Sequence, residues 1–314
     1  SFALPATRAN LENKVRLLGS TLDPKKARSD QAGWKPVAES LRRSLIEPIE
    51  RSNILENANR LAIVPYGFLH DLPFAALTKN DDGNQRFLVE DYDLFYPPSA
   101  TFLAANKPSG RKTRMITFGL NGSGKEDLPP LKFAEEESRS VAQVFSGEAI
   151  LENRADETEF KRLAPKATHL HIAAHAFAEQ DMPLFSRLIL RSSKMDDGNL
   201  TTREVFELGI DTELVTIAAC EGAKSFSADP EGLIEIDRIG LTEAFLNAGS
   251  RSVLASLAPI SDRATTDLMT TFYTNLRTKD KAASLSLAQR KMIGSPVYQH
   301  PRYWANFVLI GSDH

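Results

Sequence analysis

The stretches HIAAHAF, residues 171–177, and VTIAACEG, residues 215–222, decide the expected fold of this chain. Each contains a short apolar run that ends at a reactive side chain, His175 in the first stretch and Cys220 in the second. Short apolar runs bounded in this way predict buried β-strands. Two such strands in one parallel sheet would bring an imidazole and a thiol to the same sheet edge.

Similar apolar runs occur along the whole chain. The predicted strands are Leu61–Val64, Met115–Gly119, Leu170–Ala174, Leu214–Ala219, Ser252–Ala258 and Phe307–Gly311. Between them, apolar residues recur at helical spacing over residues 34–49, 134–145, 241–248 and 264–276. Strands that alternate with helices predict an α/β sandwich, with a mainly parallel sheet and helices on both faces.

The composition is that of a soluble globular protein. The 314 residues are 42% hydrophobic and 25% charged, which suits one large or two moderate domains. A formal charge of −3 and the lack of Lys/Arg blocks argue against nucleic acid and against an anionic membrane as partners. No apolar run approaches the ~18 residues of a transmembrane helix, and residues 1–10 do not resemble a signal peptide. We therefore expect a cytoplasmic protein.

Cys220 is the only cysteine of the chain, which excludes an intramolecular disulfide and a cysteine-based zinc site. A single cysteine is ordinarily a small buried apolar residue. A nucleophilic cysteine needs a base within hydrogen-bond reach, because an ordinary thiol is only a few per cent thiolate at neutral pH. His175 is the best-placed candidate for that base.

The motifs HIAAHAF and VTIAACEG resemble the His and Cys motifs of CHAT-domain cysteine peptidases, which are relatives of caspases and separase in clan CD. Other segments follow in the family's order: LAIVPYGFLHDLPFAAL (61–77), LPPLKFAEEE (128–137), GLTEAFLNAGSRSVLASLAPISDRAT (240–265) and YWANFVLIG (303–311). The resemblance implies a caspase-like three-layer sandwich. Residues 1–107 would be the noncatalytic helical part and residues 108–314 the catalytic part, divided near the linker-like KPSGRK at 107–112.

The resemblance also implies site residues. His175 and Cys220 would form the catalytic pair, and the backbone N–H groups of Ala176 and Cys220 would hold the oxyanion. The chain departs from the family pattern at Ala176, where Gly is usual, at Ala258, where Trp is usual, and after Glu221, where a Thr-Gly pair is usual. Alanine keeps the N–H group, but it would be strained if position 176 required a positive φ.

Asp262 is the candidate for substrate specificity because it follows the predicted strand 252–258 at the same sheet edge. It resembles the acidic residue of separase that binds the P1 side chain, which implies cleavage after Arg or Lys. The alternative is that Asp262 caps a helix that begins near Arg263. Glu221 is a second substrate-binding candidate, and Asp229 and Glu231 in the same acidic loop are weaker ones.

Other signals receive structural interpretations. His169, His171 and His175 have a spacing that a metal site could use, but the run offers no carboxylate, so we expect no metal and interpret the first two as hydrogen-bonded core residues. GLNGSGKE at 119–126 resembles a phosphate-binding loop but has Glu126 in place of the Mg²⁺-binding hydroxyl, and we interpret it as a loop. His70 is expected to be structural.

Together these observations predict a cysteine endopeptidase that needs no cofactor and acts on a protein substrate. Relatives of this kind are controlled by partner proteins or fused sensor domains, and some bacterial ones act in defence, so the resemblance implies a regulatory partner. The competing hypothesis is a caspase-like interaction module that has lost catalytic geometry, which the departures at Ala176 and Ala258 keep open.

Overall fold

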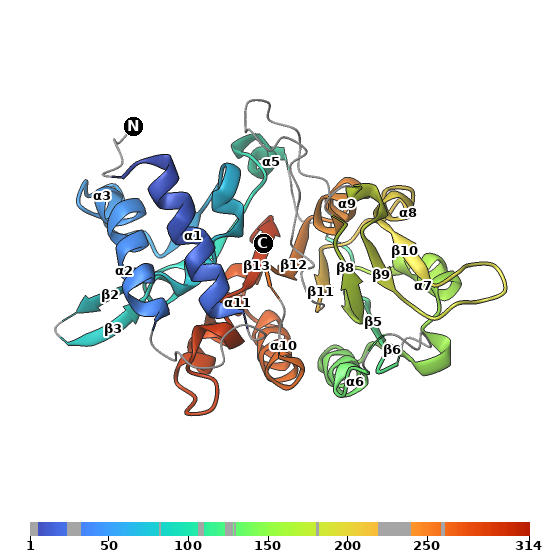
Figure 1. The fold of residues 1–314 in the computed structure, drawn as a ribbon. Helices are drawn as coiled ribbons and strands as arrows, with labels where there is room; N and C mark the ends of the chain where they lie inside the picture. The colour runs from blue at the N-terminus through green and yellow to red at the C-terminus, as the bar shows by residue number, and fades with distance from the viewer. Residues whose placement is uncertain are drawn as a thin grey trace.

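The computed structural model describes residues 6–23, 33–81, 83–105, 110–122, 128, 130–179, 182–218, 240–258 and 261–314, apart from the side chains of Ala105 and Asp262. The chain forms a mixed α/β structure (Figure 1). Its helices, other than short 3₁₀ turns, are α1 Arg8–Leu22, α2 Trp34–Leu45, α3 Glu47–Glu50, α4 Leu88–Asp91, α5 Ala100–Ala105, α6 Ala134–Val144, α7 Glu157–Leu163, α8 Thr202–Phe206, α9 Leu241–Asn247, α10 Asp262–Leu276 and α11 Lys281–Ile293. Its strands are β1 Arg60–Ala62, β2 Thr78–Asp81, β3 Asn84–Phe87, β4 Asp93–Phe95, β5 Met115–Gly119, β6 Glu148–Leu151, β7 His169–Ala173, β8 His175–Phe177, β9 Arg187–Ile189, β10 Asn199–Thr201, β11 Leu214–Ile217, β12 Ser252–Ser256 and β13 Phe307–Gly311.

The central sheet has the order β13-β12-β11-β7-β5-β6 among the described residues. All neighbours in it are parallel except β12 and β13. Its strands β5, β7, β11, β12 and β13 match five of the six predicted runs to within two residues. The prediction of a mainly parallel sheet is therefore confirmed.

The N-terminal part of the chain extends this sheet past β13. The N–H of Tyr96 donates to the carbonyl of Leu309 at 2.8 Å, and the N–H of Gly311 donates to the carbonyl of Tyr96 at 3.0 Å. Tyr96 directly follows β4, which pairs with β1 in parallel. In Figure 1, β13 lies between the N-terminal helices α1–α3 and the other strands of the central sheet. The segment that ends at Tyr96 is thus joined to the central sheet by backbone pairing.

Helices cover both faces of the central sheet, as predicted. One face carries Thr117, His171 and Thr216, which are in register across β5, β7 and β11. Thr117 donates to the Ser138 carbonyl of α6 at 3.0 Å, and the Thr216 hydroxyl lies 2.6 Å from that of Tyr273 in α10. The alternate residues of the strands face the other side, where Phe118 packs on Phe160 of α7. The apolar packing on this face, and the buried row of Thr117, His171 and Thr216 on the other, fix the positions of the ends of β7 and β11.

Several elements differ from the sequence expectations. The predicted helix 34–49 is divided at Ile46 into α2 and α3, with Pro48 in the first turn of α3, because proline suits the first turn of a helix and not its interior. The predicted strand 61–64 is the shorter β1. Helix α11 and the antiparallel sheet of β8, β9 and β10 have no counterpart in the predictions. None of the described helices is long and apolar enough to span a bilayer.

Candidate active site

The strand ends that carry the predicted catalytic residues are neighbours. Strands β7 and β11 pair in parallel from His169 opposite Leu214 to Ile172 opposite Ile217. The pairing continues beyond β11, because the N–H of Ala218 donates to the carbonyl of Ile172 at 2.9 Å. His175 begins β8 two residues after β7 ends. Cys220 and Glu221 lie outside the described residues, and Ala218 is the last described residue before them.

Small buried side chains pack together beneath the carboxyl ends of β7 and β11. Ala173 at the end of β7, Ala218 after β11 and Ala134 at the start of α6 are buried and pack together, with Leu131 against them. Asn121, which follows β5, fixes the entry to α6: its carbonyl accepts from the N–H of Leu131 at 2.7 Å and its side chain from Glu135 N–H at 3.0 Å. The strand ends therefore rest on a packed base.

Ala176 has extended backbone in β8, opposite Leu188 of β9. An alanine in extended conformation carries none of the strain that a positive φ would impose. The departure from Gly at this position, which the sequence left as a question of geometry, therefore causes no backbone strain here.

The pairing pattern of the small sheet fixes the direction of the Ala176 N–H group. On the β10 side of β9, Leu190 donates to the Gly198 carbonyl at 2.9 Å and the Ser186 carbonyl accepts from Thr202 at 2.7 Å. Even-numbered residues of β9 thus bond toward β10, and the odd-numbered ones turn toward β8. The odd-numbered β9 residues are opposite His175 and Phe177, so Ala176 between them directs its N–H and C=O away from β9.

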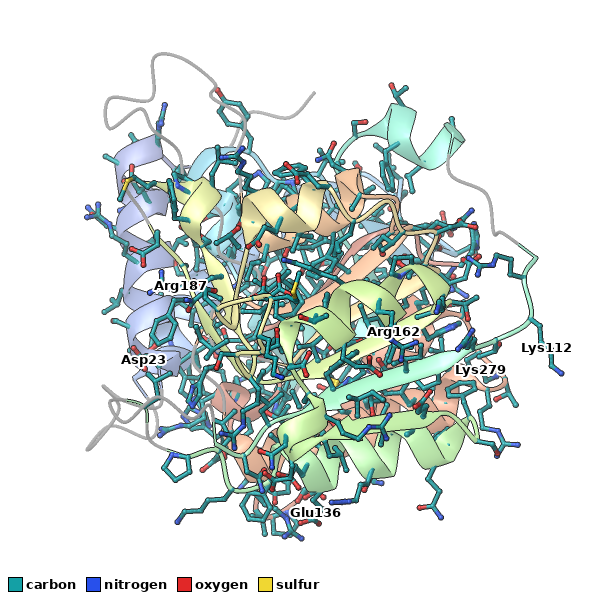
Figure 2. All side chains as sticks on the ribbon, turned by 90° about the vertical axis from the view of Figure 1, so that its right-hand side faces the viewer. Asp23, Lys112, Glu136, Arg162, Arg187 and Lys279 are labelled. Atoms are coloured by element: carbon teal, nitrogen blue, oxygen red, sulfur yellow. The ribbon has the colours of Figure 1, made fainter. Side chains whose placement is uncertain are left out.

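The small sheet lies at the carboxyl edge of the central sheet. In Figure 2, Arg187 of β9 is at the opposite side of the molecule from Lys112, which precedes the start of β5. Phe177 and Arg187 are a cross-strand pair in this sheet, with the guanidinium carbon of Arg187 5.3 Å from the Phe177 ring centre. Arg187 also pairs with Glu179 at 2.5 Å. The sequence reasoning missed these residues, because three-residue strands carry too little periodicity to be recognised.

Helices α6 and α10 begin at the same edge. Arg263 in the first turn of α10 lies 5.2 Å from the ring of Phe133, which precedes α6. Helix N-termini carry a partial positive charge that favours a nearby anion such as a thiolate. Helix α10 begins at Asp262, and Ser261 is its N-cap residue, so the expectation that Asp262 caps the helix is wrong by one residue. The side chain of Asp262 is outside the described set.

The two histidines of strand β7, His169 and His171, are held by contacts within the fold. Nε2 of His171 lies 2.9 Å from Oε1 of Glu137, and both side chains are almost fully buried. His169 stacks on Phe145, and its pKa is lowered to about 4, first by burial and then by the charge of Lys281. The interpretation of His171 as a hydrogen-bonded core residue is confirmed. Within the described ranges, no three His, Cys, Asp or Glu residues gather as a metal site would require.

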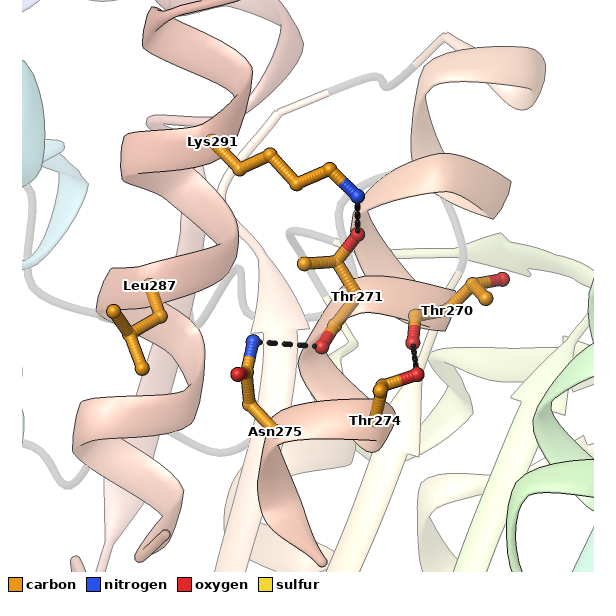
Figure 3. Close-up of a pocket in the computed structure, with 6 residues that line it drawn as sticks. All are labelled: Thr270, Thr271, Thr274, Asn275, Leu287 and Lys291. Atoms are coloured by element: carbon orange, nitrogen blue, oxygen red, sulfur yellow. Dashed lines mark hydrogen bonds between the residues drawn. The ribbon is translucent and has the colours of Figure 1, made fainter. Parts of the chain in front are cut away.

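A cavity of about 420 Å³ lies between α10 and α11, away from this edge (Figure 3). Its lining residues are Thr270, Thr271, Thr274, Asn275, Leu287 and Lys291. The three threonine hydroxyls donate to carbonyls four residues earlier in α10, and Lys291 donates to Thr271 at 3.2 Å. Thr270 is eight residues after Asp262, about 12 Å along the helix. The polar groups of this cavity are already used within the two helices, and we assign it no role in the site.

Comparison with known proteins identifies the family of the chain. The sequence model of the CHAT domain matches residues 35–312. Tetratricopeptide repeat protein 28 is 26% identical in Homo sapiens, over 89% of this chain and 13% of that protein. The mouse (Mus musculus) counterpart is 24% identical over 96% of this chain and 14% of its own length. The chain therefore spans about one seventh of the curated relatives that it matches.

Solved structures show the same fold at low identity. The Arg-specific cysteine proteinase gingipain R, RgpB of Porphyromonas gingivalis, superposes with a TM-score of 0.54 at 7% identity, over 97% of this chain and 74% of that one. Separase of Saccharomyces cerevisiae, solved with securin, superposes with a TM-score of 0.51 at 12% identity, over 77% of this chain and 14% of that one. The fold is therefore that of caspase-like cysteine peptidases.

Proposed function

The chain belongs to the CHAT domain family, and we propose that it is a cysteine endopeptidase in which Cys220 is the nucleophile and His175 the general base. The observation that carries the proposal is the adjacency of β7 and β11 up to the bond from Ala218 to Ile172. His175 follows the first strand by two residues, and Cys220 follows Ala218 by two residues. Two extended residues span at most about 7 Å, so both reactive groups start from neighbouring strand ends.

The proposed reaction is acyl transfer through a thioester. His175 takes the thiol proton of Cys220, and the thiolate sulfur bonds to the scissile carbonyl carbon. The carbonyl oxygen becomes an oxyanion, which accepts hydrogen bonds from the N–H groups of Ala176 and Cys220. The carbon–nitrogen bond then breaks while the His175 imidazolium gives its proton to the leaving amine. Water, deprotonated by His175, hydrolyses the thioester and restores the thiol.

The orientation of Ala176 supports its part in this reaction. Its N–H points away from β9 at the position directly after the base, where an oxyanion donor is needed. The alanine in place of glycine keeps this donor in relaxed extended backbone. The N-termini of α6 and α10 add positive potential on the same edge, which favours both the thiolate and the oxyanion.

We further propose that Asp262 binds a basic P1 side chain. It is the first residue of α10, at the carboxyl edge next to the end of β12. A carboxylate that pairs with Arg or Lys in a closed pocket gives a charge-assisted bond that a neutral P1 residue lacks. The Arg specificity of gingipain R, which shares the fold, agrees with this assignment. Glu221 remains a second candidate for substrate binding.

Control by another protein is part of the proposal. Separase was solved in complex with securin, and the curated relatives that the chain matches are several times longer than it. The alternative function is a catalytically silent interaction module, which is favoured by curated relatives named for tetratricopeptide repeats and not for proteolysis. An activity measurement separates the two.

The test is cleavage of a positional-scanning fluorogenic peptide library by the wild type, by Cys220→Ala and by His175→Ala. We expect wild-type cleavage after Arg or Lys, and a loss of at least about 10³-fold in each variant, as for other catalytic groups of acyl-transfer enzymes. A control variant, Glu12→Ala on the exposed surface of α1, should keep full activity. Cleavage that survives Cys220→Ala overturns the nucleophile assignment, and silence of the wild type with partner proteins present favours the interaction module.

A further inference from the structure

We propose that the edge of β8 turned away from β9, here called the outer edge of β8, binds the leaving-group side of the substrate as a parallel strand. In this arrangement the carbonyl of Ala176 accepts a hydrogen bond from the backbone N–H of P2′, the second residue after the scissile bond. The inference rests on the proposed function and adds to it a binding site for the part of the substrate that leaves first.

The pairing pattern of the small sheet places two backbone groups of Ala176 on this outer edge. Ala176 lies between His175 and Phe177, whose partners on β9 are Ile189 and Arg187. Its N–H and its C=O both point away from β9. Within the described ranges, β8 pairs with β9 alone. If the N–H of Ala176 binds the P1 oxyanion, the carbonyl of Ala176 is left as an acceptor for a later residue of the substrate strand.

The parallel register follows from the two hydrogen bonds that one residue can make. In a parallel pair, the N–H and C=O of one residue bond to the residues before and after its partner. When the N–H of Ala176 donates to the carbonyl oxygen of P1, the residue opposite Ala176 is P1′. The carbonyl of Ala176 then accepts a hydrogen bond from the N–H of P2′. In an antiparallel pair both bonds would go to P1, and the leaving group would run back past His175 toward Ala174.

Burial along the chain favours the parallel register. Ala173 and Ala174 are 2% and 0% exposed, and the carbonyl of Ala173 is used by the N–H of Leu120 at 3.0 Å. His175, Ala176 and Phe177 are all partly exposed. A peptide can therefore extend along β8 toward Phe177, whereas the segment before His175 is covered.

The position of the proposed P1 pocket gives the same direction. Asp262 follows β12, which is separated from β7 by β11 in the sheet order. The P1 side chain and the residues before it therefore lie over the β11 and β12 side of the edge. The small sheet on the His175 side is left for the residues after the scissile bond, whose amine receives the proton of His175.

The same register assigns a side chain to the P2′ pocket. Residues opposite each other in a sheet point to the same face, so the P2′ side chain lies on the face of Phe177. Arg187 packs on the Phe177 ring and is itself held by Glu179 at 2.5 Å. The turn of this hairpin also exposes Met182, Leu184 and Phe185, by 57%, 42% and 57%. The partly exposed Phe177 ring therefore offers an apolar contact to the P2′ side chain.

The test uses quenched fluorescent peptides with the best P1 residue, in which single backbone nitrogens are methylated. Methylation at P2′ removes the bond to Ala176 and should lower kcat/KM about three- to tenfold, the usual effect of one hydrogen bond. Methylation at P3′ is the matched control, because that N–H points away from β8, and it should leave kcat/KM within about twofold. Phe177→Ala should reduce the preference for Leu over Ala at P2′ by at least about threefold without changing the P1 preference.

The outcomes distinguish this inference from the function on which it rests. If the unmodified peptides are not cleaved at all, the proposed function fails and this inference fails with it. If they are cleaved but the P2′ and P3′ methylated peptides react equally, the peptidase stands and the parallel register is wrong. Sensitivity at the N–H of P1 with none at P2′ would show the antiparallel register instead.

Discussion

Nε2 of His171 lies 2.9 Å from Oε1 of Glu137, with both side chains buried in the layer between the central sheet and α6. The hydroxyl of Thr266 in α10 approaches the other carboxylate oxygen at 3.4 Å. The pair connects β7, α6 and α10, which all reach the carboxyl edge where the catalytic residues are proposed. It therefore couples the stability of the core to the placement of His175, four residues further along the chain.

Removing one partner of this pair should destabilise the fold strongly. Glu137→Ala leaves the buried His171 ring without its hydrogen-bond partner, and we expect a loss of about 1–3 kcal/mol in the free energy of unfolding. Glu137→Gln keeps the shape and a hydrogen bond, so it should cost less. Urea denaturation measures both, with Glu12→Ala as the control in an exposed pair with Arg16, expected to cost less than about 1 kcal/mol. A loss for Glu137→Ala equal to that of the control would contradict the role of the pair.

Lys281 should make stability depend on alkaline pH. The residue is 3% exposed, and its ammonium donates to the Ser252 hydroxyl at 2.9 Å. Burial lowers the pKa of Lys281 to about 8 against the weaker effect of nearby Glu213. The other charged neighbours are Arg251, which lowers the pKa further, and Asp313 and Asp280, which raise it. Between pH 8 and about 10.5 the unfolded chain binds this proton and the folded chain does not, so stability rises with pH.

The measurement is the difference in unfolding free energy between the wild type and Lys281→Met as a function of pH. We expect the wild type to gain about 1–3 kcal/mol of stability relative to Lys281→Met from pH 8 to pH 10. Between about pH 6 and pH 7 it should be nearly constant, because the lysine is charged in both states there. A difference that stays constant up to pH 10 would show that the folded pKa is not depressed.

The two halves of the chain should remain together after the linker is cut. Tyr96 pairs with β13 through two backbone hydrogen bonds, and Arg60 of β1 contacts Asp280 and Asp313 at 2.5 Å each. A specific protease site inserted after Pro108 allows cleavage between the parts. We expect the two fragments to co-elute in size-exclusion chromatography, whereas separate elution would mean that residues 1–107 form an independent domain.

Asp262 should control the P1 preference without supplying chemistry. In Asp262→Ala, the preference for Arg over Ala at P1 should fall at least about tenfold, because a charge-assisted bond in the pocket is lost. Cleavage after neutral residues should persist. Asp267→Ala, a second carboxylate five residues further along α10, is the matched control and should keep the basic preference. If both variants behave alike, the P1 pocket lies elsewhere, with Glu221 as the next candidate.

The parts of the fold that could be predicted are those whose signal is local. Buried parallel strands such as β7 and β11 are short, largely apolar runs, and the end of β7 locates His175 directly. Helix α11 escaped prediction because its buried face includes small or polar residues, among them Ala282, Ser284 and Gln289. The amide of Gln289 donates to the carbonyls of Trp304 and Phe307, contacts that only the folded chain reveals.

The residue types of the site could be predicted from the sequence, but the directions in which their groups point could not. The direction of the Ala176 N–H depends on how β9 pairs with β10, so it cannot be read from the residues around position 176. The pairing of His171 with Glu137 joins residues 34 positions apart. The start of α10 was placed one residue late, because Asp262 and Ser261 are both good N-cap residues.

The central claim is that Cys220 is activated by His175, and the pH dependence of alkylation tests it most directly. Because Cys220 is the only cysteine, the rate at which iodoacetamide adds to the intact protein reports this thiol alone. We predict that the wild type reacts rapidly down to about pH 6, whereas His175→Ala follows an ordinary thiol with a pKa of about 8.5. Identical profiles for the two proteins, both rising only near pH 8.5, would contradict the account.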